Sequence, residues 1–271
     1  GRFDLLAVAV DLPHADPVAF GKGGVQGERR HVDRDGEFLL RAFVGDTQRN
    51  VEVTRGHKLA LEVLLLLLGA RFVTVDELAA ELEKRGERPS LLLHACCAPC
   101  SSHTLTVLAE RFRVTLYFCN PNIAPESEFE YRSRELKRLV SEMGLDIEII
   151  EEPYDSAPFY ALAKGLEDLP ERGERCRKCI ALRLEMAGAK ARELGTDYFT
   201  TTLTISPHKD CAFINECGLK ISQECGVKYL CSDFKKHDGY KHSIELSKQY
   251  DLYRQNYCGC VYSKKLREEN Q

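Results

Sequence analysis

The stretch that decides the fold of this chain reads Leu91-Leu92-Leu93-His94-Ala95-Cys96-Cys97-Ala98-Pro99-Cys100. A short, continuous apolar run is typical of a strand that is buried on both faces of a parallel sheet. Three cysteines within five positions follow this run, and a helix-like segment at residues 101–111 comes next. The stretch therefore predicts a strand, a loop that carries thiols and a helix, in that order.

Beyond this stretch, strand-like and helix-like segments alternate almost to the end of the chain. This alternation predicts an α/β fold with a mostly parallel sheet and helices on both faces. Because ligands bind beyond the carboxyl ends of such strands, we expect the loop at residues 95–100 to belong to the functional site. The predicted strands are residues 91–95, 114–119, 146–150, 198–203 and 227–231, and the predicted helices are residues 101–111, 126–143, 158–166, 176–194, 212–225 and 243–250.

The first 90 residues differ in composition from the rest of the chain. All 12 cysteines, all 11 tyrosines and every isoleucine lie after residue 90. We expect residues 1–90 to form a small N-terminal α+β extension of unknown function, and residues 91–271 to form the main domain. A small packing domain is favoured there over a helix-turn-helix. In the extension, strands are predicted at residues 5–10, 37–44 and 51–54, and helices at residues 57–68 and 75–86.

Charge and hydropathy restrict the classes of protein to consider. The net charge is −4, so any contact with nucleic acid has to come from a local basic patch. The longest apolar run, residues 63–68, is far too short to span a membrane. The sequence begins Gly1-Arg2-Phe3-Asp4 without the pattern of a secretory signal, so we expect a cytoplasmic protein. In a reducing compartment, close cysteine pairs indicate metal or redox sites.

A second cysteine group, Cys176-Arg177-Lys178-Cys179, has the spacing that lets two thiolates bind one metal. Together with Cys96 and Cys97 it offers four sulfurs, which suit a [4Fe–4S] cluster or a structural zinc ion. Adjacent cysteines fit one small tetrahedral ion poorly, whereas the irons of a cluster lie further apart. The spacing therefore favours an iron–sulfur cluster over zinc.

A third group, Cys258-Gly259-Cys260, follows the last predicted helix. Such a pair can act as a redox-active dithiol or can supply metal ligands, and the sequence leaves both open. His94 is predicted to make ordinary hydrogen bonds at its strand end, although a role as proton donor or ligand stays open. The remaining cysteines stand singly and are predicted to be small buried hydrophobic residues: Cys119, Cys211, Cys217, Cys225 and Cys231.

Two polar segments are candidates for substrate contacts. Residues 200–209 read as a strand that runs into a polar loop, in which Ser206 and Lys209 would suit a phosphate or ribose, or simply cap the loop. Residues 232–242 combine lysines with aromatic side chains, a pattern that can bind single-stranded RNA but more often belongs to a solvated loop. The lysines concerned are Lys235, Lys236 and Lys241, and Arg254 and residues 264–267 extend this basic surface.

Taken together, these motifs resemble the QueH family of epoxyqueuosine reductases. The resemblance covers residues 91 to about 265 and leaves residues 1–90 unexplained. The combination is specific, although no single motif would be. The matching pieces, in the order of the family, are His94–Cys100, Glu174–Cys179, Thr201–Pro207, Ser232–Lys236 with Gly239–Lys241, and Leu252–Cys260.

The resemblance implies a cobalamin-independent reductase that converts epoxyqueuosine to queuosine at the wobble position of tRNA, the last step of queuosine biosynthesis. It also implies a nucleotide-hydrolase-like domain related to PP-loop enzymes, an electron donor that the sequence does not name, and a [4Fe–4S] cluster with room for an additional iron. Cys96, Cys97, Cys176 and Cys179 would bind the cluster, and Cys258 and Cys260 would form the redox-active pair. Cys100 would serve the extra iron or the substrate, and Lys235, Lys236 and Lys241 would hold the anticodon loop.

Three other functions stay open at this point. A PP-loop tRNA-thiolating enzyme would need a phosphate-binding loop rich in glycine and serine, where this chain has residues 95–100 without glycine. A zinc-stapled RNA-binding module would use the same thiols without catalysis. A general thiol–disulfide oxidoreductase would need only Cys258 and Cys260.

Overall fold

The computed structural model describes residues 38–44, 47–53, 78, 82 and 86–269, and it divides the chain into two compact units, residues 1–72 and 73–271. In the first unit, strand β1 (Phe38–Val44) pairs antiparallel with β2 (Thr47–Val53), which confirms the last two strands predicted there. The predicted strand at 5–10 and helix at 57–68 lie outside the described residues, as does most of the helix at 75–86. That residues 1–90 are a separate domain stays a prediction.

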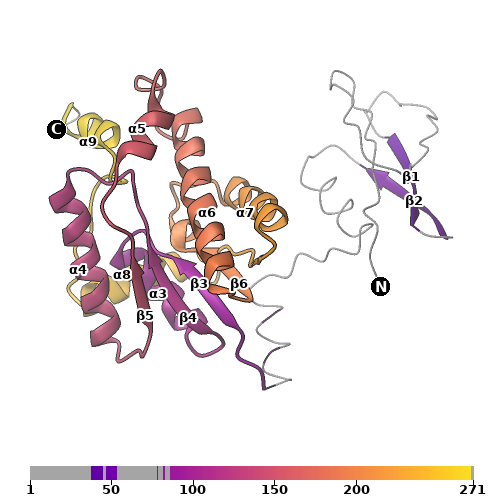
Figure 1. Cartoon of the computed structure of the whole chain (residues 1–271), viewed down its shortest axis with the longest axis horizontal. Helices are drawn as coiled ribbons and strands as arrows, with labels where there is room; N and C mark the ends of the chain where they lie inside the picture. The colour runs from indigo at the N-terminus through magenta and orange to yellow at the C-terminus, as the bar shows by residue number, and fades with distance from the viewer. Residues whose placement is uncertain (1–37, 45–46, 54–77, 79–81, 83–85, 270–271) are drawn as a thin grey trace. The chain divides into compact units, whose positions relative to one another are not determined.

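The second unit is built on a five-stranded sheet in the order β5-β4-β3-β6-β7, in which every neighbouring pair is parallel (Figure 1). This confirms the predicted parallel sheet. Its strands are β3 (Ser90–His94), β4 (Arg113–Phe118), β5 (Glu148–Glu151), β6 (Tyr198–Thr201) and β7 (Lys228–Tyr229).

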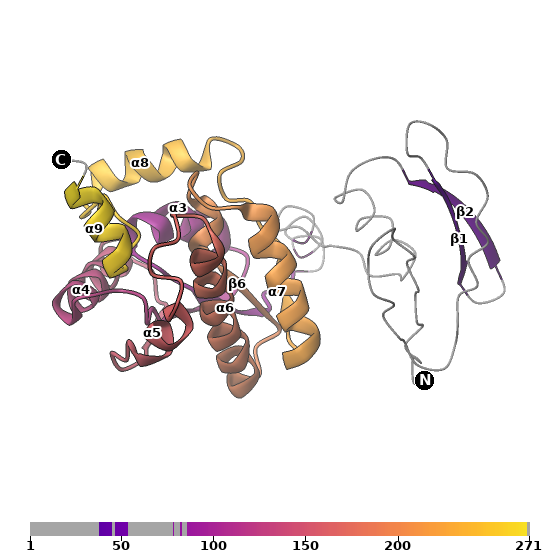
Figure 2. The ribbon, with the colours of Figure 1, turned by 90° about the horizontal axis from the view of Figure 1, so that it is seen from above.

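Helices cover both faces of this sheet. Helix α3 packs against α4 and α8, whereas α6 packs against α7 and contacts β3 and β6. Figure 2 shows α3 with α8 on one side and α6 with α7 on the other. The helical elements are α3 (Ala98–Leu108), α4 (Glu126–Glu142), α5 (Ala157–Ala163), α6 (Glu174–Leu194), η1 (Thr202–Ile205), α7 (Cys211–Cys225), α8 (Gly239–Gln249) and α9 (Val261–Glu269).

The order of the strands creates a switch point between β3 and β6. The chain runs from β3 outward through β4 to β5, then returns to the other side of β3 to form β6 and β7. Because parallel crossovers are right-handed, the two directions place their helices on opposite faces. The loops after β3 and β6 therefore diverge, and they leave a crevice at the carboxyl edge of the sheet.

The central strand explains why the opening stretch has the sequence it has. Leu91, Leu92 and Leu93 have no exposed surface, because helices cover both faces of β3 and strands pair with both of its edges. Burying a leucine side chain contributes about 2 kcal/mol, so this strand is firmly anchored. The loop that follows it therefore starts from a fixed point.

Several elements differ from the prediction in their bounds: α3 begins at Ala98 and not at residue 101, so Cys100 is helical, and β7 covers only two of the predicted residues 227–231. Three further differences concern β6, α8 and α9. Strand β6 ends at Thr201 and the chain turns into the 3-10 helix η1, because the N–H of Leu203 donates to Thr201 Oγ1 at 3.2 Å. Helix α8 already begins at Gly239, so the end of the predicted basic loop is helical. A Cβ at Gly239 would lie 2.0 Å from the carbonyl oxygen of Phe234, which explains the glycine. Helix α9 had not been predicted.

No helix among the described residues has the length and apolar character needed to cross a membrane.

Candidate metal and redox centre

A cavity of about 550 Å³ lies at the carboxyl edge of the sheet, where the loops after β3 and β6 diverge. Helices α3, α6 and α7 begin at this cavity, and the segment that precedes α9 forms a further wall. The three cysteine groups, which are far apart in the sequence, therefore meet at one place, as predicted. The thiols that line the cavity are Cys96, Cys97, Cys100, Cys176, Cys179, Cys258 and Cys260.

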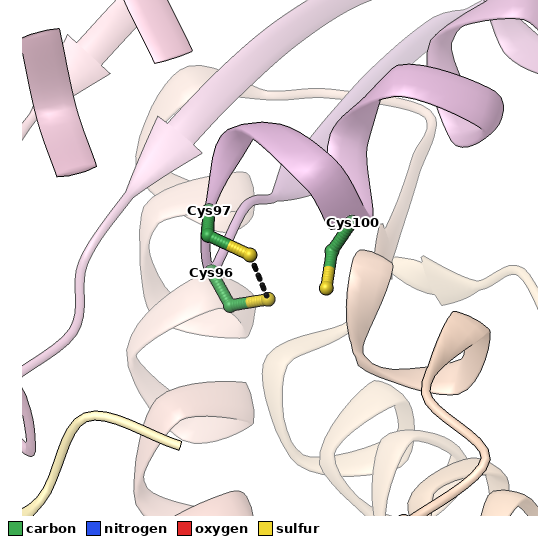
Figure 3. A group of neighbouring side chains, drawn as sticks. All are labelled: Cys96, Cys97 and Cys100. Atoms are coloured by element: carbon green, nitrogen blue, oxygen red, sulfur yellow. Dashed lines mark hydrogen bonds between the residues drawn. The ribbon is translucent and has the colours of Figure 1, made fainter. Parts of the chain in front are cut away.

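Three of these thiols form a compact triad. The sulfur atoms of Cys96, Cys97 and Cys100 all lie within 4.8 Å of one another, and the Sγ atoms of Cys96 and Cys97 are 3.7 Å apart. Figure 3 shows the three side chains turned toward one another at the start of α3. Cys97 is the extended N-cap residue of this helix and Cys100 lies in its first turn. The positive end of the helix thus favours thiolates in the triad.

A threonine at the start of η1 holds the first thiol of the triad. The hydroxyl of Thr202 accepts a hydrogen bond from the backbone N–H of Cys96 at 3.2 Å and donates to Cys96 Sγ at 3.4 Å. Thr202 has no exposed surface, because it sits where β6 passes into η1. The sequence motif Thr201–Pro207 contains this residue, but sequence reasoning gave it no role.

The pKa values of the triad thiols are shifted in opposite directions. The pKa of Cys96 lies well below its usual range, because Cys100 and Cys97 donate hydrogen bonds to its sulfur and Lys209 lies nearby. Hydrogen bonds from Cys100 to Cys96 and Cys97, together with burial, raise the pKa of Cys100 well above its usual range. The arrangement thus favours the deprotonated form at Cys96, which is the form that a metal ligand takes.

Buried arginines supply positive charge around the cavity. Arg132, Arg175 and Arg183 all line the cavity, and each side chain is at most 5% exposed. Burial lowers the pKa of Arg183, but the opposing charges of Cys179 and Cys96 outweigh burial and raise it. Buried cations are stabilised only by anionic or hydrogen-bonding partners. Arg132 has such a partner in Glu128 at 2.7 Å and Arg175 has carbonyl oxygens, whereas Arg183 is placed to stabilise thiolate forms of the cavity cysteines. Sequence reasoning missed all three, since an isolated arginine carries no signal.

The pair Cys176 and Cys179 approaches the same cavity from the other face of the sheet. Both residues lie in the first turns of α6, and Cys179 is buried while Cys176 is half-buried. Arg175 fixes the entry to this helix, since its Nη1 donates to the carbonyl oxygens of Leu166 and Leu169. Within the part of the chain that the structure describes, the closely spaced sulfur group is the triad, and this pair shares the cavity without joining that group.

The third group, Cys258-Gly259-Cys260, forms a tight loop in which the two sulfur atoms are 3.7 Å apart and both thiols are free. Cys260 is buried, whereas Cys258 is exposed. The pKa of Cys258 is lowered well below its usual range, chiefly by the hydrogen bond between its sulfur and that of Cys260. Gly259 has a φ of +120°, and a Cβ there would lie 2.9 Å from Ile123, so this loop needs glycine.

This loop belongs to no strand of the sheet, and separate hydrogen bonds hold it in place, among them one from the backbone N–H of Ala124 to the carbonyl oxygen of Gly259 at 2.9 Å. The backbone N–H of Cys258 donates to Ser263 Oγ at 3.3 Å, and the N–H of Ser263 donates to Cys260 Sγ at 3.4 Å. The hydroxyl of Ser263 also donates to Glu171, and Arg132 donates to the carbonyl oxygen of Cys258 at 3.3 Å. Ser263 lies in α9, so missing that helix also meant missing this contact.

The predicted substrate residues fall into two sets. Ser206 and Lys209 line the cavity beside the thiols. Lys235 donates to the carbonyl oxygen of Thr204 at 3.0 Å and pairs with Asp233, also at 3.0 Å. Two more lysines are exposed and are not among the residues that line the cavity: Lys236 and Lys241.

His94 takes the ordinary role that was predicted for a strand-end histidine. Its Nε2 lies 3.1 Å from the carbonyl oxygen of Cys119 and must therefore donate, which leaves Nδ1 to accept from Thr201 Oγ1 at 2.8 Å. Burial, together with the charge of Arg183, lowers the pKa of His94 to about 4, so the ring is neutral at pH 7. The five cysteines that stand singly do not line the cavity.

Fold and site together define an α/β protein with a thiol-lined cavity at the switch point of a parallel sheet. The sequence profile of "Epoxyqueuosine reductase QueH" matches residues 91–266, so the chain belongs to the QueH family, as the sequence motifs predicted. A protein of that name from Streptococcus pyogenes is 44% identical over 196 residues, covering 71% of this chain and 77% of that protein. The QueH of Thermotoga maritima is 36% identical and covers 66% and 93% of the two chains.

Solved structures resemble the chain only distantly. The U34-tRNA thiolase NcsA from Methanococcus maripaludis with its [4Fe-4S] cluster has a TM-score of 0.43 and 12% identity, and the match covers 70% of this chain and 68% of that chain. NMN synthetase from Francisella tularensis has a TM-score of 0.40 at 10% identity, covering 68% and 74% of the two chains. Likeness at this level carries no argument about the site.

Proposed function

We propose that this chain reduces epoxyqueuosine at the wobble position of tRNA to queuosine, in the cytoplasm, as the last step of queuosine biosynthesis. The observation that carries the proposal is the convergence of all seven grouped thiols on one cavity. Family membership supplies the reaction, and the cavity supplies groups that suit reductive chemistry. A module that only binds RNA has no need to line one cavity with seven thiols and buried arginines.

The reaction removes one oxygen atom from the substrate and needs two electrons and two protons. Both C–O bonds of the epoxide break, a C=C bond forms, and the oxygen leaves as water. The pair of Cys258 and Cys260 can supply both electrons when an S–S bond forms between the two sulfurs. With Cys258 as the thiolate, the S–H of Cys260 releases one of the two protons and water supplies the other. Their separation of 3.7 Å supports this role. An external electron donor, and not cobalamin, then returns the pair to the dithiol.

The donor set of the cavity fits an iron–sulfur cluster. Cys96, Cys97, Cys176 and Cys179 would hold a [4Fe–4S] cluster, which would supply one-electron transfer when bound. Cys100, the third thiol of the triad, is proposed as a catalytic residue that serves an additional iron or the substrate. Two features of the chain support these roles: Thr202 orients Cys96, and Arg183 balances the charge of the thiolates.

The cavity also fits the substrate in size. Its volume of about 550 Å³ lies inside the range of small-ligand sites, about 300–1,000 Å³, and would admit one nucleoside. Anticodon-loop bases are unpaired, so one of them can be extruded at small cost. Ser206 and Lys209 are proposed to contact this nucleoside, while Lys235, Lys236 and Lys241 are proposed to contact the anticodon loop outside the cavity.

Reduction of tRNA that contains epoxyqueuosine tests the proposal. The chain is reconstituted with iron and sulfide without oxygen and given a chemical reductant, and the nucleosides are then analysed by mass spectrometry. We expect queuosine to appear with the unchanged chain and with Cys217→Ser, whose thiol lies outside the cavity. Absence of queuosine from a protein with an intact cluster would refute the proposed activity.

A further inference from the structure

Positive charge is concentrated at the cavity in a way that the whole chain does not show. Eight arginine and lysine side chains line the cavity, against two carboxylates, although the chain carries a net charge of −4. Glu128, which pairs with Arg132 at 2.7 Å, and the thiolate forms favoured at Cys96 and Cys258 offset part of this excess. The remainder is a local positive field on a protein that is acidic overall, which favours an anionic partner at this place.

The basic residues of the cavity form two layers. The inner layer is the three buried arginines, Arg132, Arg175 and Arg183. The outer layer is exposed or half-exposed, and it comes from segments that are far apart in the sequence: the loop before α6, the first turn of α6, the loop after η1 and the loop before α9. We call this outer layer the cationic rim, and it consists of Arg172, Arg177, Lys209 and Arg254. The eighth basic residue of the cavity, Arg267, pairs with Glu171 at 3.3 Å and is not part of the rim.

The charges of the cationic rim are poorly neutralised by the protein. Arg172 donates to Nδ1 of His208 at 3.0 Å, and Arg254 donates to the hydroxyl of Ser247 at 3.0 Å, so both contacts are with neutral acceptors. Arg177 meets Asp210 only at 3.8 Å with both side chains more than half exposed, a geometry that contributes little. Across the described residues, Lys209 has no carboxylate within ion-pair distance.

An aromatic side chain lies directly under this rim. The guanidinium of Arg177 lies over the ring of Phe213, 4.9 Å from its centre, and the ring is half-buried at the cavity. Two further aromatic residues, Tyr240 and Tyr257, line the cavity and are also half-buried. Exposed arginines beside accessible rings are the combination that binds unpaired nucleotides, through phosphate contacts and stacking.

We propose that the cationic rim binds the phosphates of a single-stranded RNA segment and that Phe213 stacks on one of its bases. The nucleotide held between these contacts then enters the cavity. The inference rests on the proposed function in one respect, since that function identifies the segment as an anticodon loop. It adds named binding residues at the cavity itself, whereas the three lysines predicted from the sequence to hold the anticodon loop, Lys235, Lys236 and Lys241, are not among the residues that line the cavity.

Binding of an unmodified anticodon stem–loop RNA tests the rim without any reduction step. The dissociation constant of the full chain is measured by fluorescence anisotropy over a range of salt concentrations. The variants Arg172→Gln, Arg177→Gln and Arg254→Gln are each expected to weaken binding severalfold and to lower the slope of log K against log salt by about 0.7, the value for one lost contact with single-stranded nucleic acid. Phe213→Ala is expected to weaken binding about tenfold with the slope unchanged, because stacking carries no charge.

Arg134→Gln is the matched control, because Arg134 is an equally exposed arginine on α4 that does not line the cavity. Rim variants whose slope equals that of the control would overturn the proposal. So would a slope that falls only in Lys236→Gln and Lys241→Gln. The RNA carries no epoxide, so a chain that binds through the rim but forms no queuosine refutes the activity and leaves the rim standing. If instead the chain forms queuosine and the rim variants bind the RNA as the control variant does, the rim is refuted and the activity stands.

Discussion

The two cysteine loops of the cavity are held by different parts of the structure. The triad loop, residues 96–100, follows the fully buried strand β3 and continues directly into α3, so the sheet itself determines where its thiols lie. The loop at residues 258–260 follows no strand and is held by separate hydrogen bonds with Ala124, Ser263 and Arg132. A support by the sheet suits thiols that bind metal, whereas a support by a few separate hydrogen bonds suits a pair that forms and breaks a bond.

Replacing a buried thiol of the triad should have the largest effect. Cys97→Ser removes one of the ligands proposed for the cluster, so we expect loss of most of the iron and acid-labile sulfide and a fall in queuosine formation of about 10³-fold or more. Elemental and sulfide analysis of the protein, purified without oxygen, measures the first effect. If the chain without substitutions is colourless and contains about one zinc ion and no sulfide, the triad loop holds no iron–sulfur cluster, and the comparison of a metal-binding loop with a redox loop fails.

Replacing a thiol of the other loop should separate metal binding from turnover. Cys258→Ser leaves the proposed ligands intact, so we expect unchanged iron and sulfide content but a loss of queuosine formation of about 10²- to 10³-fold. The two measurements are made on the same sample. If iron is lost in parallel with activity, Cys258 is a ligand and the division between the two loops is wrong.

The backbone of the second loop gives a third test. Gly259→Ala places a Cβ 2.9 Å from Ile123 at a φ of +120°, which should lower the free energy of unfolding by about 2–3 kcal/mol and slow turnover. Denaturant unfolding measures the first effect. Gly226→Ala is the control, because it has a φ of +78° but nothing within 4 Å of the added Cβ, so only about 1–2 kcal/mol of backbone strain should appear. If Gly259→Ala and Gly226→Ala lower the free energy of unfolding equally, the loop at residues 258–260 is not closely packed.

The smallest effect is expected from the hydroxyl that holds the second loop. Ser263→Ala removes the hydrogen bonds with Cys258 N–H and Glu171, which should destabilise the fold by about 1–3 kcal/mol and change the reduction potential of the Cys258 and Cys260 pair. Equilibration with glutathione measures that potential. Ser102→Ala is the control, because its buried hydroxyl donates only within α3, to Pro99. A potential that stays unchanged in Ser263→Ala would mean that this contact supports the fold alone.

Most of the architecture was predictable because the signals that specify it are local. The apolar run at residues 91–93, the cysteine spacings and the alternation of strand-like and helix-like segments are properties of short windows, and parallel topology follows from them. The errors also have local causes. A hydrogen bond from the N–H of Leu203 to the Thr201 side chain ends β6 early. Helix α9 was missed because it follows directly on the cysteine loop at residues 258–260, whose thiols were interpreted as a site and not as the start of a helix.

The site was only half predictable, because its supporting residues act over long distances in the sequence. Thr202 holds a thiol that lies 106 positions earlier, and Arg132 holds a loop that lies 126 positions later. Neither residue stands in a pattern that local reasoning can detect. The same holds for the cationic rim, whose members come from four separate segments, whereas the basic run at residues 232–242 is visible in the sequence but lies largely outside the cavity.

The sequence by itself determined the class of fold, the three groups of thiols and the family, since strand periodicity and cysteine spacing are written in consecutive residues. The tertiary structure confirmed that the three groups share one cavity, and it alone decided that Cys100 joins Cys96 and Cys97 in a triad and that buried arginines line the cavity. The reason is topological. Parallel strands bring their carboxyl ends to one edge whatever their separation in the chain, and the reversal between β3 and β6 turns that edge into a crevice.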